Sequence, residues 1–86
     1  SNSKNIAIDD FVKKYNIDLS KSYAYGDTNG DINMLKRVGN PIAINPTNEL
    51  LQKIKNDPAI RDISTIIIER KDLVYKLPAS VEILDI

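Results

Sequence analysis

The chain has 86 residues, with twelve basic and twelve acidic side chains, a formal net charge of zero and a pI near 6.1. A chain of this length forms one domain at most and buries roughly 60 to 65% of its unfolded surface. Its balanced charge disfavours nucleic acid and anionic membranes as partners. Because the sequence contains neither cysteine nor histidine, disulfides, thiolate metal sites and Ser-His triads are excluded.

The apolar runs are far shorter than the roughly 20 residues that cross a bilayer, and the N-terminus lacks a basic-then-apolar leader pattern. We therefore expect a soluble, cytoplasmic protein. The opening Ser1-Asn2 resembles the remnant of a cleaved expression tag, so residues 1–3 are set aside as tag or disordered chain. Residues 1–86 are expected to form a single, partial domain.

Helical and strand patterns alternate through the first half of the chain. A helix is predicted over residues 5–15, because apolar side chains follow the spacing i, i+3, i+4 and i+7 at Ile8, Phe11, Val12 and Tyr15. The short aromatic stretch 22–25 runs into Gly26 and predicts a strand, in which Tyr23 and Tyr25 are interpreted as core residues.

A second helix is predicted over residues 31–38, with Leu35 and Val38 on its apolar face, before Gly39 and Pro41 end it. Residues 42–44 then predict a short buried strand. In the next helix Asn45 is the expected cap and Pro46 the first helical residue. Its core-facing side chains are expected to be Leu50, Leu51 and Ile54.

The last third of the chain changes to strand signals. Asp57-Pro58 is expected to break the preceding helix, and the β-branched run 63–69 predicts a third strand. Residues 72–77 either pair with that strand as a hairpin across 69–71 or lie on the surface. The whole order predicts an α/β fold with a parallel, Rossmann-like sheet and flanking helices, in the form of half a doubly wound domain.

The loop after the first predicted strand carries the candidate chemistry, because parallel sheets bind ligands beyond the carboxyl ends of their strands. Asp27 and Asp31 lie four residues apart across this turn, so their carboxylates can point into one space. Oxygen donors with net negative charge suit Mg²⁺, and Ca²⁺ is the competitor. Gly26 and Gly30 give the loop its tight turn and close backbone approach. The structural alternative is that both aspartates only cap the turn and the helix.

Two stretches carry a family resemblance: residues 23–35, YAYGDTNGDINML, and residues 38–46, VGNPIAINP. Together they resemble the fourth motif of haloacid dehalogenase-superfamily phosphatases, most closely the branch that contains phosphoserine phosphatase. In that motif a strand leads into Gly-Asp-x-x-x-Asp, a Met-Leu pair, a Val-Gly and an apolar strand that ends in Asn-Pro. The resemblance covers about residues 4–77 and implies the C-terminal half of the family's sheet. Asn33 departs from the family, which often has proline there.

The resemblance also implies roles for particular residues. Asp27 would bind Mg²⁺ directly, and Asp31 would bind the metal or one of its waters. Lys4 stands at the spacing of the family's third motif, whose catalytic lysine steadies the charge of the nucleophile and the phosphate. The alternative for Lys4 is an exposed lysine at the start of a helix.

The family's nucleophile is absent from this chain. The resemblance implies a mechanism in which the first aspartate of an Asp-x-Asp motif attacks phosphorus to form an aspartyl-phosphate and the second acts as general acid and base. No two aspartates here are separated by a single residue. We therefore expect a C-terminal fragment of a Mg²⁺-dependent phosphatase that acts on a small phosphate monoester, and we expect the fragment alone to be inactive.

In the family, the nucleophile strand lies beside the strand that corresponds to residues 22–25. Its absence would leave that strand with an unpaired edge, and such edges seek partners. We therefore expect this chain to self-associate, or to pair with a missing N-terminal part, through the exposed edge.

Two alternatives belong to other classes of protein. A calcium-binding module of the EF-hand or dockerin type shares the acidic spacing of Asp27 to Asp31, but such a loop needs glycine at its sixth position and an acidic ligand at its twelfth, where this chain has Ile32 and Val38. The other alternative is a truncated scaffold that keeps the fold without activity.

Overall fold

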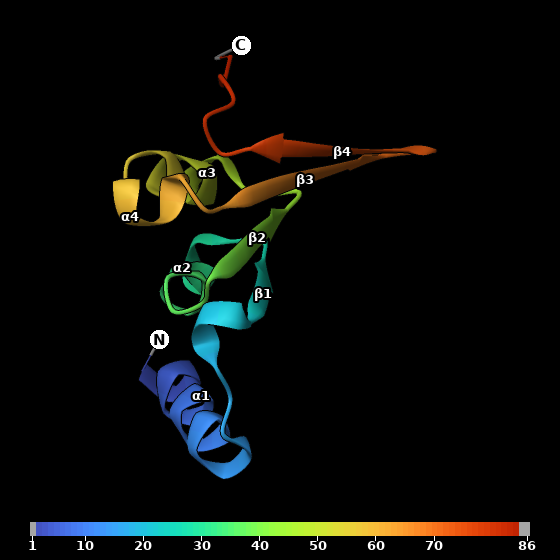
Figure 1. Cartoon of the computed structure of the whole chain (residues 1–86). Helices are drawn as coiled ribbons and strands as arrows, with labels where there is room; N and C mark the ends of the chain where they lie inside the picture. The colour runs from blue at the N-terminus through green and yellow to red at the C-terminus, as the bar shows by residue number, and fades with distance from the viewer. Residues whose placement is uncertain (1, 85–86) are drawn as a thin grey trace.

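The computed structural model describes residues 2–84, and the side chains of residues 5–84. Helices and strands alternate along the chain as far as α3, as the sequence predicts, and a further helix then precedes the last two strands (Figure 1). In chain order the elements are α1 Asn2–Tyr15, η1 Leu19–Lys21, β1 Tyr23–Gly26, η2 Asn29–Asp31, α2 Ile32–Leu35, β2 Asn40–Ile44, α3 Asn48–Lys55, α4 Pro58–Arg61, β3 Thr65–Arg70 and β4 Leu73–Pro78.

The four strands form one sheet in the order β1-β2-β3-β4. β1 pairs with β2 in parallel, and β2 with β3 in parallel, with Tyr25 opposite Ile42 and Ala43 opposite Ile66. The last pair, β3 with β4, is antiparallel. The fold is therefore α/β with a mostly parallel sheet, and residues 72–77 form the hairpin rather than a surface tail. α1 lies beside the β1 end of the sheet, and the β3–β4 hairpin projects from the opposite end (Figure 1).

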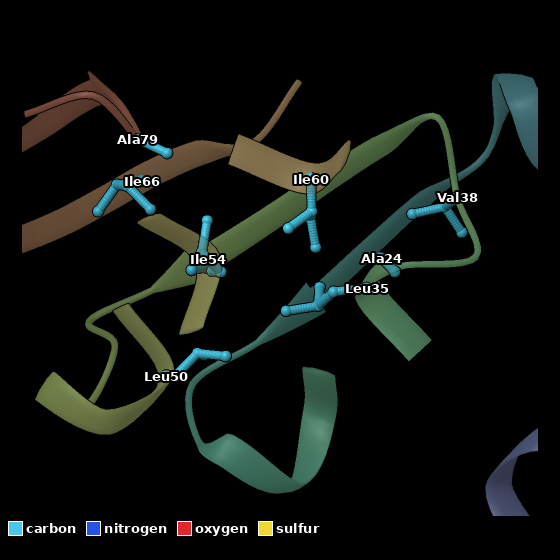
Figure 2. Packing of buried hydrophobic residues seen from close by; sticks show 9 residues of the cluster. Ala24, Leu35, Val38, Leu50, Ile54, Ile60, Ile66 and Ala79 are labelled. Carbon is cyan, nitrogen blue, oxygen red and sulfur yellow. The ribbon is translucent and has the colours of Figure 1, made fainter. Parts of the chain in front are cut away.

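A single apolar core lies between one face of the sheet and the helices α2, α3 and α4 (Figure 2). Leu50 and Ile54 are fully buried, and Leu51 packs against the cluster, as predicted. Leu35 and Val38 are also buried, as their spacing indicated. The buried members of the core are Ala24, Leu35, Val38, Ala43, Leu50, Ile54, Ile60, Ile66 and Ala79.

The opposite face of the sheet is not covered by any helix in the described part of the chain, and this overturns the prediction that Tyr23 and Tyr25 are core residues. Tyr23 is 63% exposed and Tyr25 is 55% exposed. Side chains alternate between the faces of a strand, so Ala24 points to the helices while the two tyrosines point to the open face. Strand periodicity predicted the alternation but not which face would be covered.

The apolar stripe of α1 is likewise only partly buried. Ile8 and Val12 are half-buried, whereas Phe11 is 59% exposed and Tyr15 is 58% exposed. The helix is joined to the domain by the Arg37 guanidinium, which donates to the backbone carbonyl of Asn5 at 3.1 Å and pairs with the carboxylate of Asp9. The predicted helix is confirmed, but the described chain supplies no surface that covers its whole stripe.

Three predicted boundaries are wrong for local reasons. The second helix ends at Leu35 rather than residue 38, because the chain must turn and enter β2 at Asn40, which pairs with Tyr23. At the next helix Asn45 is not the cap; the hydroxyl of Thr47 accepts the hydrogen bond from the Leu50 N–H at 3.2 Å, and helix α3 begins at Asn48.

The third boundary concerns Asp57-Pro58, which starts a helix as well as ending one. The Asp57 carboxylate accepts from the Ala59 N–H at 3.1 Å, and Pro58 occupies the first turn of α4. Proline suits that position because its missing N–H would have no helical partner there. The third strand consequently begins at Thr65 instead of residue 63.

Among residues 2–84, no helix is long and apolar enough to cross a membrane.

Candidate metal centre

The predicted metal loop, residues 26–31, follows the carboxyl end of β1, which lies beside the carboxyl end of the parallel strand β2. β1 ends at Gly26 and β2 at Ile44, and both ends meet at one edge of the sheet. A shallow hollow opens there, and its lining residues are Tyr25, Gly26, Asp27, Asp31, Ile44 and Asn45. The structure therefore brings the two predicted ligands to the same hollow.

Asp31 uses its carboxylate to hold the loop. Its Oδ2 atom accepts hydrogen bonds from the backbone N–H groups of Asp27 at 3.1 Å and Thr28 at 3.2 Å, and the Thr28 hydroxyl lies 3.5 Å away. These contacts are the turn-capping role that was the structural alternative for the motif. Asp31 thus has a local structural role that does not depend on a bound ion.

Asp27 is arranged differently. Its side chain is exposed, and its carboxylate makes no hydrogen bond or ion pair with the side chains that the structure describes. Its backbone, in contrast, is held on both sides, because its N–H donates to Asp31 and its carbonyl accepts from the Thr47 N–H at 2.9 Å. The result is a fixed backbone that presents an available carboxylate at the mouth of the sheet.

Gly26 makes this arrangement sterically possible. A Cβ atom at that position would lie 2.6 Å from Cβ and 3.0 Å from Cγ of Asp31. Real side chains do not approach this closely, so any larger residue would displace Asp31 from the loop. The glycine of the Gly-Asp-x-x-x-Asp motif is therefore required for the contact between β1 and the loop.

The donor set fits a hard dication in part. Mg²⁺ is bound by one or two carboxylates and completes its six ligands with water and substrate phosphate, and the hollow offers the two carboxylates Asp27 and Asp31. Within residues 5–84, no three acidic, histidine or cysteine side chains gather into a complete metal cage. The hollow is thus suited to an ion that takes its other ligands from elsewhere.

Two residues near the loop were not assigned to the site by sequence reasoning. Asn45 lines the hollow, although its place in the Asn-Pro pair suggested only a helix cap. Asn29 lies within the loop, and its Oδ1 atom is buried without a hydrogen-bond partner among the described residues. No sequence signal distinguishes these two from other loop asparagines.

The calcium-module alternative is not supported by the packing. At the sixth and twelfth positions of such a loop stand Ile32, which is half-buried against the core, and Val38, which is buried in it. Neither side chain carries an oxygen or faces the hollow. The loop therefore cannot close around Ca²⁺ in the way that an EF-hand does.

Lys4 lies in the first turn of α1. Its side chain is outside the described side chains, 5–84, so its catalytic role stays a prediction.

Comparison with known families gives a match over the first part of the chain. The model of the haloacid dehalogenase-like hydrolases matches residues 1–58, which include α1, the metal loop, β2 and α3. The chain belongs to this family. The match ends at the start of α4, so the β3–β4 hairpin of this haloacid dehalogenase-like chain lies beyond it. No curated protein and no solved structure matches the chain.

Proposed function

We propose that this haloacid dehalogenase-like chain is the C-terminal, Mg²⁺-binding portion of a phosphatase that hydrolyses a small phosphate monoester, from the branch that resembles phosphoserine phosphatase. The observation that carries the proposal is the available carboxylate of Asp27 on a backbone fixed by Asp31 and Thr47. A metal ligand needs this combination, because the oxygen must be accessible while its position is constrained.

In this proposal Asp27 holds Mg²⁺ directly, and Asp31 binds the ion or one of its waters while it continues to hold the loop. When bound, the ion supplies positive charge that stabilises the oxygens of a transferring phosphoryl group. The exposed position of the hollow at the carboxyl edge of the sheet gives a small phosphorylated metabolite access. Lys4 would steady the phosphate charge from the start of α1.

The nucleophile and the general acid of the proposed aspartyl-phosphate mechanism are not within residues 1–86, which contain no Asp-x-Asp sequence. We propose that they come from a segment outside these residues. The 86-residue chain alone is then inactive, and a cytoplasmic location remains part of the proposal.

The proposed partner surface is the outer edge of β1, where a strand from a second copy or from a segment outside residues 1–86 would pair. β1 is the terminal strand of the sheet. Beside it runs an apolar groove that is lined by residues of α1, β1 and α2, including Ile8, Phe11 and Tyr23. A further strand would cover this groove and satisfy the backbone groups of the edge.

The test is a titration of the wild type and of Asp27→Asn with MgCl₂, with and without inorganic phosphate. The titration is monitored by ¹H-¹⁵N spectra. We expect saturable shifts at the amides of residues 26–31 in the wild type, and their loss in Asp27→Asn. Purified chain should not turn over p-nitrophenyl phosphate. Identical spectra with and without Mg²⁺ would instead support the non-catalytic scaffold, for which the capping contacts of Asp31 are sufficient.

A further inference from the structure

Asn45 has a backbone conformation that is unusual for a residue with a side chain. Its φ angle is 43°, in the left-handed region that asparagine enters more readily than most residues. It stands directly after β2, between the buried strand and the turn that leads to α3. The chain bends at this residue, which lines the same hollow as Asp27.

Both ends of the Asn45 amide are fixed to one residue of the neighbouring strand. The Oδ1 atom accepts from the backbone N–H of Glu69 at 2.8 Å, and the Nδ2 group donates to the Glu69 carboxylate at 3.1 Å. In addition, the Asn45 backbone N–H donates to the carbonyl of Ile67 at 2.8 Å. Three hydrogen bonds thus attach this turn to β3.

The same turn is attached to the metal loop by its other end. Two residues after Asn45, the Thr47 N–H donates to the carbonyl of Asp27 at 2.9 Å. This is the contact that holds the Asp27 backbone from the side opposite to Asp31. Glu69 is therefore connected to Asp27 in three steps: hydrogen bonds join Glu69 to Asn45, the backbone joins Asn45 to Thr47, and a hydrogen bond joins Thr47 to Asp27.

We infer that Asn45, held by Glu69, is a positioning residue of the metal centre: it fixes the turn 45–47 so that Thr47 holds Asp27 in the place where its carboxylate binds the ion. This inference rests on the proposed function, because it assigns Asn45 a role toward the ion of that site. Asn45 itself has its amide committed to β3 and acts through Asp27. Partners that orient a metal ligand commonly change metal affinity by about 10- to 100-fold when they are removed.

The decisive variant is Asn45→Gly, because glycine accepts the left-handed backbone while it removes both amide contacts. The chain offers a matched control in Asn16→Gly. Asn16 also has a positive φ, 53°, but it is exposed at the end of α1 and outside the hollow. Both variants make the same chemical change at a left-handed asparagine, so a general effect of glycine on stability is common to them.

We expect Asn45→Gly to weaken Mg²⁺ binding about tenfold and to speed exchange of the Thr47 amide in the metal-free protein, with both values unchanged within about twofold in Asn16→Gly. Two substitutions at Glu69 distinguish the effect of its hydrogen bond to Asn45 from the effect of its charge. Glu69→Gln keeps an acceptor for the Asn45 amide and Glu69→Ala does not, while both remove the same charge. The backbone contacts of Asn45 with Glu69 and Ile67 remain in both variants. If the Glu69 carboxylate helps to position the turn, Glu69→Ala should bind Mg²⁺ more weakly than Glu69→Gln.

The outcomes separate this inference from the proposed function. If wild type and Asp27→Asn respond to Mg²⁺ in the same way, both proposals fail together. If the wild type binds through Asp27 but Asn45→Gly binds equally well, only the positioning role is overturned. Equal affinities for the two Glu69 variants, both below that of the wild type, would overturn the role of the Glu69 carboxylate, because charge alone would then explain the loss.

Discussion

The carboxylate of Asp31 accepts a hydrogen bond from the backbone N–H of Asp27 at 3.1 Å, so one predicted metal ligand holds the backbone of the other. The two aspartates of the motif are therefore not equivalent. Asp31 combines a structural contact with its place in the hollow, whereas the carboxylate of Asp27 is available. This asymmetry leads to opposite expectations for stability and for metal binding.

Asp27→Asn should weaken Mg²⁺ binding by about tenfold or more, yet change the free energy of unfolding by less than about 0.5 kcal/mol. Asp31→Asn should weaken Mg²⁺ binding less, but lower stability by roughly 0.5 to 1.5 kcal/mol, because a neutral amide oxygen is a weaker acceptor for the loop N–H groups. Calorimetric titration and urea unfolding measure the two quantities. Equal effects of both substitutions on Mg²⁺ affinity would contradict the ligand assignment.

Gly26→Ala should destabilise the protein by roughly 1 to 3 kcal/mol, because its Cβ would overlap Asp31 and force the loop away from β1. Gly30→Ala is the matched control in the same loop, since the nearest atom to its Cβ would be the Thr28 hydroxyl oxygen at 3.7 Å, an ordinary contact. Its stability should stay within about 0.5 kcal/mol of the wild type. Thermal unfolding of the two variants is the measurement, and similar losses would show that the close approach at Gly26 is not limiting.

The exposed edge of β1 leads to a prediction about association of the chain, which a substitution at Tyr25 tests. The Asn40 N–H donates to the Ser22 carbonyl at 3.1 Å, so by alternation along the strand the backbone groups of Tyr23 and Tyr25 point away from β2. Tyr25→Pro should therefore prevent strand addition at the edge while it leaves the β1–β2 hydrogen bonds intact. Sedimentation velocity over a concentration series should show association of the wild type that is absent in Tyr25→Pro.

The matched control for the edge is Tyr25→Thr, which removes the aromatic ring but keeps the outward N–H. It should still associate, more weakly than the wild type. A wild-type chain that is a well-folded monomer at every concentration, with fast-exchanging amides at Tyr23 and Tyr25, would argue against pairing through this edge.

The ion pair between Lys36 and Asp57 predicts a loss of stability in acid. The Lys36 ammonium lies 2.9 Å from the Asp57 carboxylate, and this hydrogen bond, with a second from the Ala59 N–H, holds the pKa of Asp57 below its ordinary value of 3.8. Because the folded pKa is the lower one, the contribution of Asp57 is present above pH 3.8 and is lost as the pH falls through the folded pKa. Urea unfolding of wild type and Lys36→Met should differ at pH 7 and converge well below pH 3.8. A difference that persists in acid would mean that Lys36 acts through packing.

The sequence by itself determined the alternation of helices and strands as far as α3, the position of the candidate loop after β1 and part of the buried core. Leu35, Leu50 and Ile54 are buried because their spacing matches the period of the helices that carry them. The run of glycine and short acidic residues after an aromatic strand was sufficient to predict the turn after β1, where Asp27 and Asp31 line one hollow. These features depend on local geometry, which neighbouring residues along the chain specify.

Only the tertiary structure decided which groups those local patterns would meet. Tyr23 and Tyr25 alternate correctly with Ala24, but their exposure follows from the absence of a described element over that face of the sheet. Asn45 could have capped a helix, yet its amide meets Glu69, 24 residues later in the chain, because β2 and β3 are parallel neighbours. The burial of a residue and the partners of a polar group depend on strand register and packing between distant segments, and one-dimensional periodicity does not encode these.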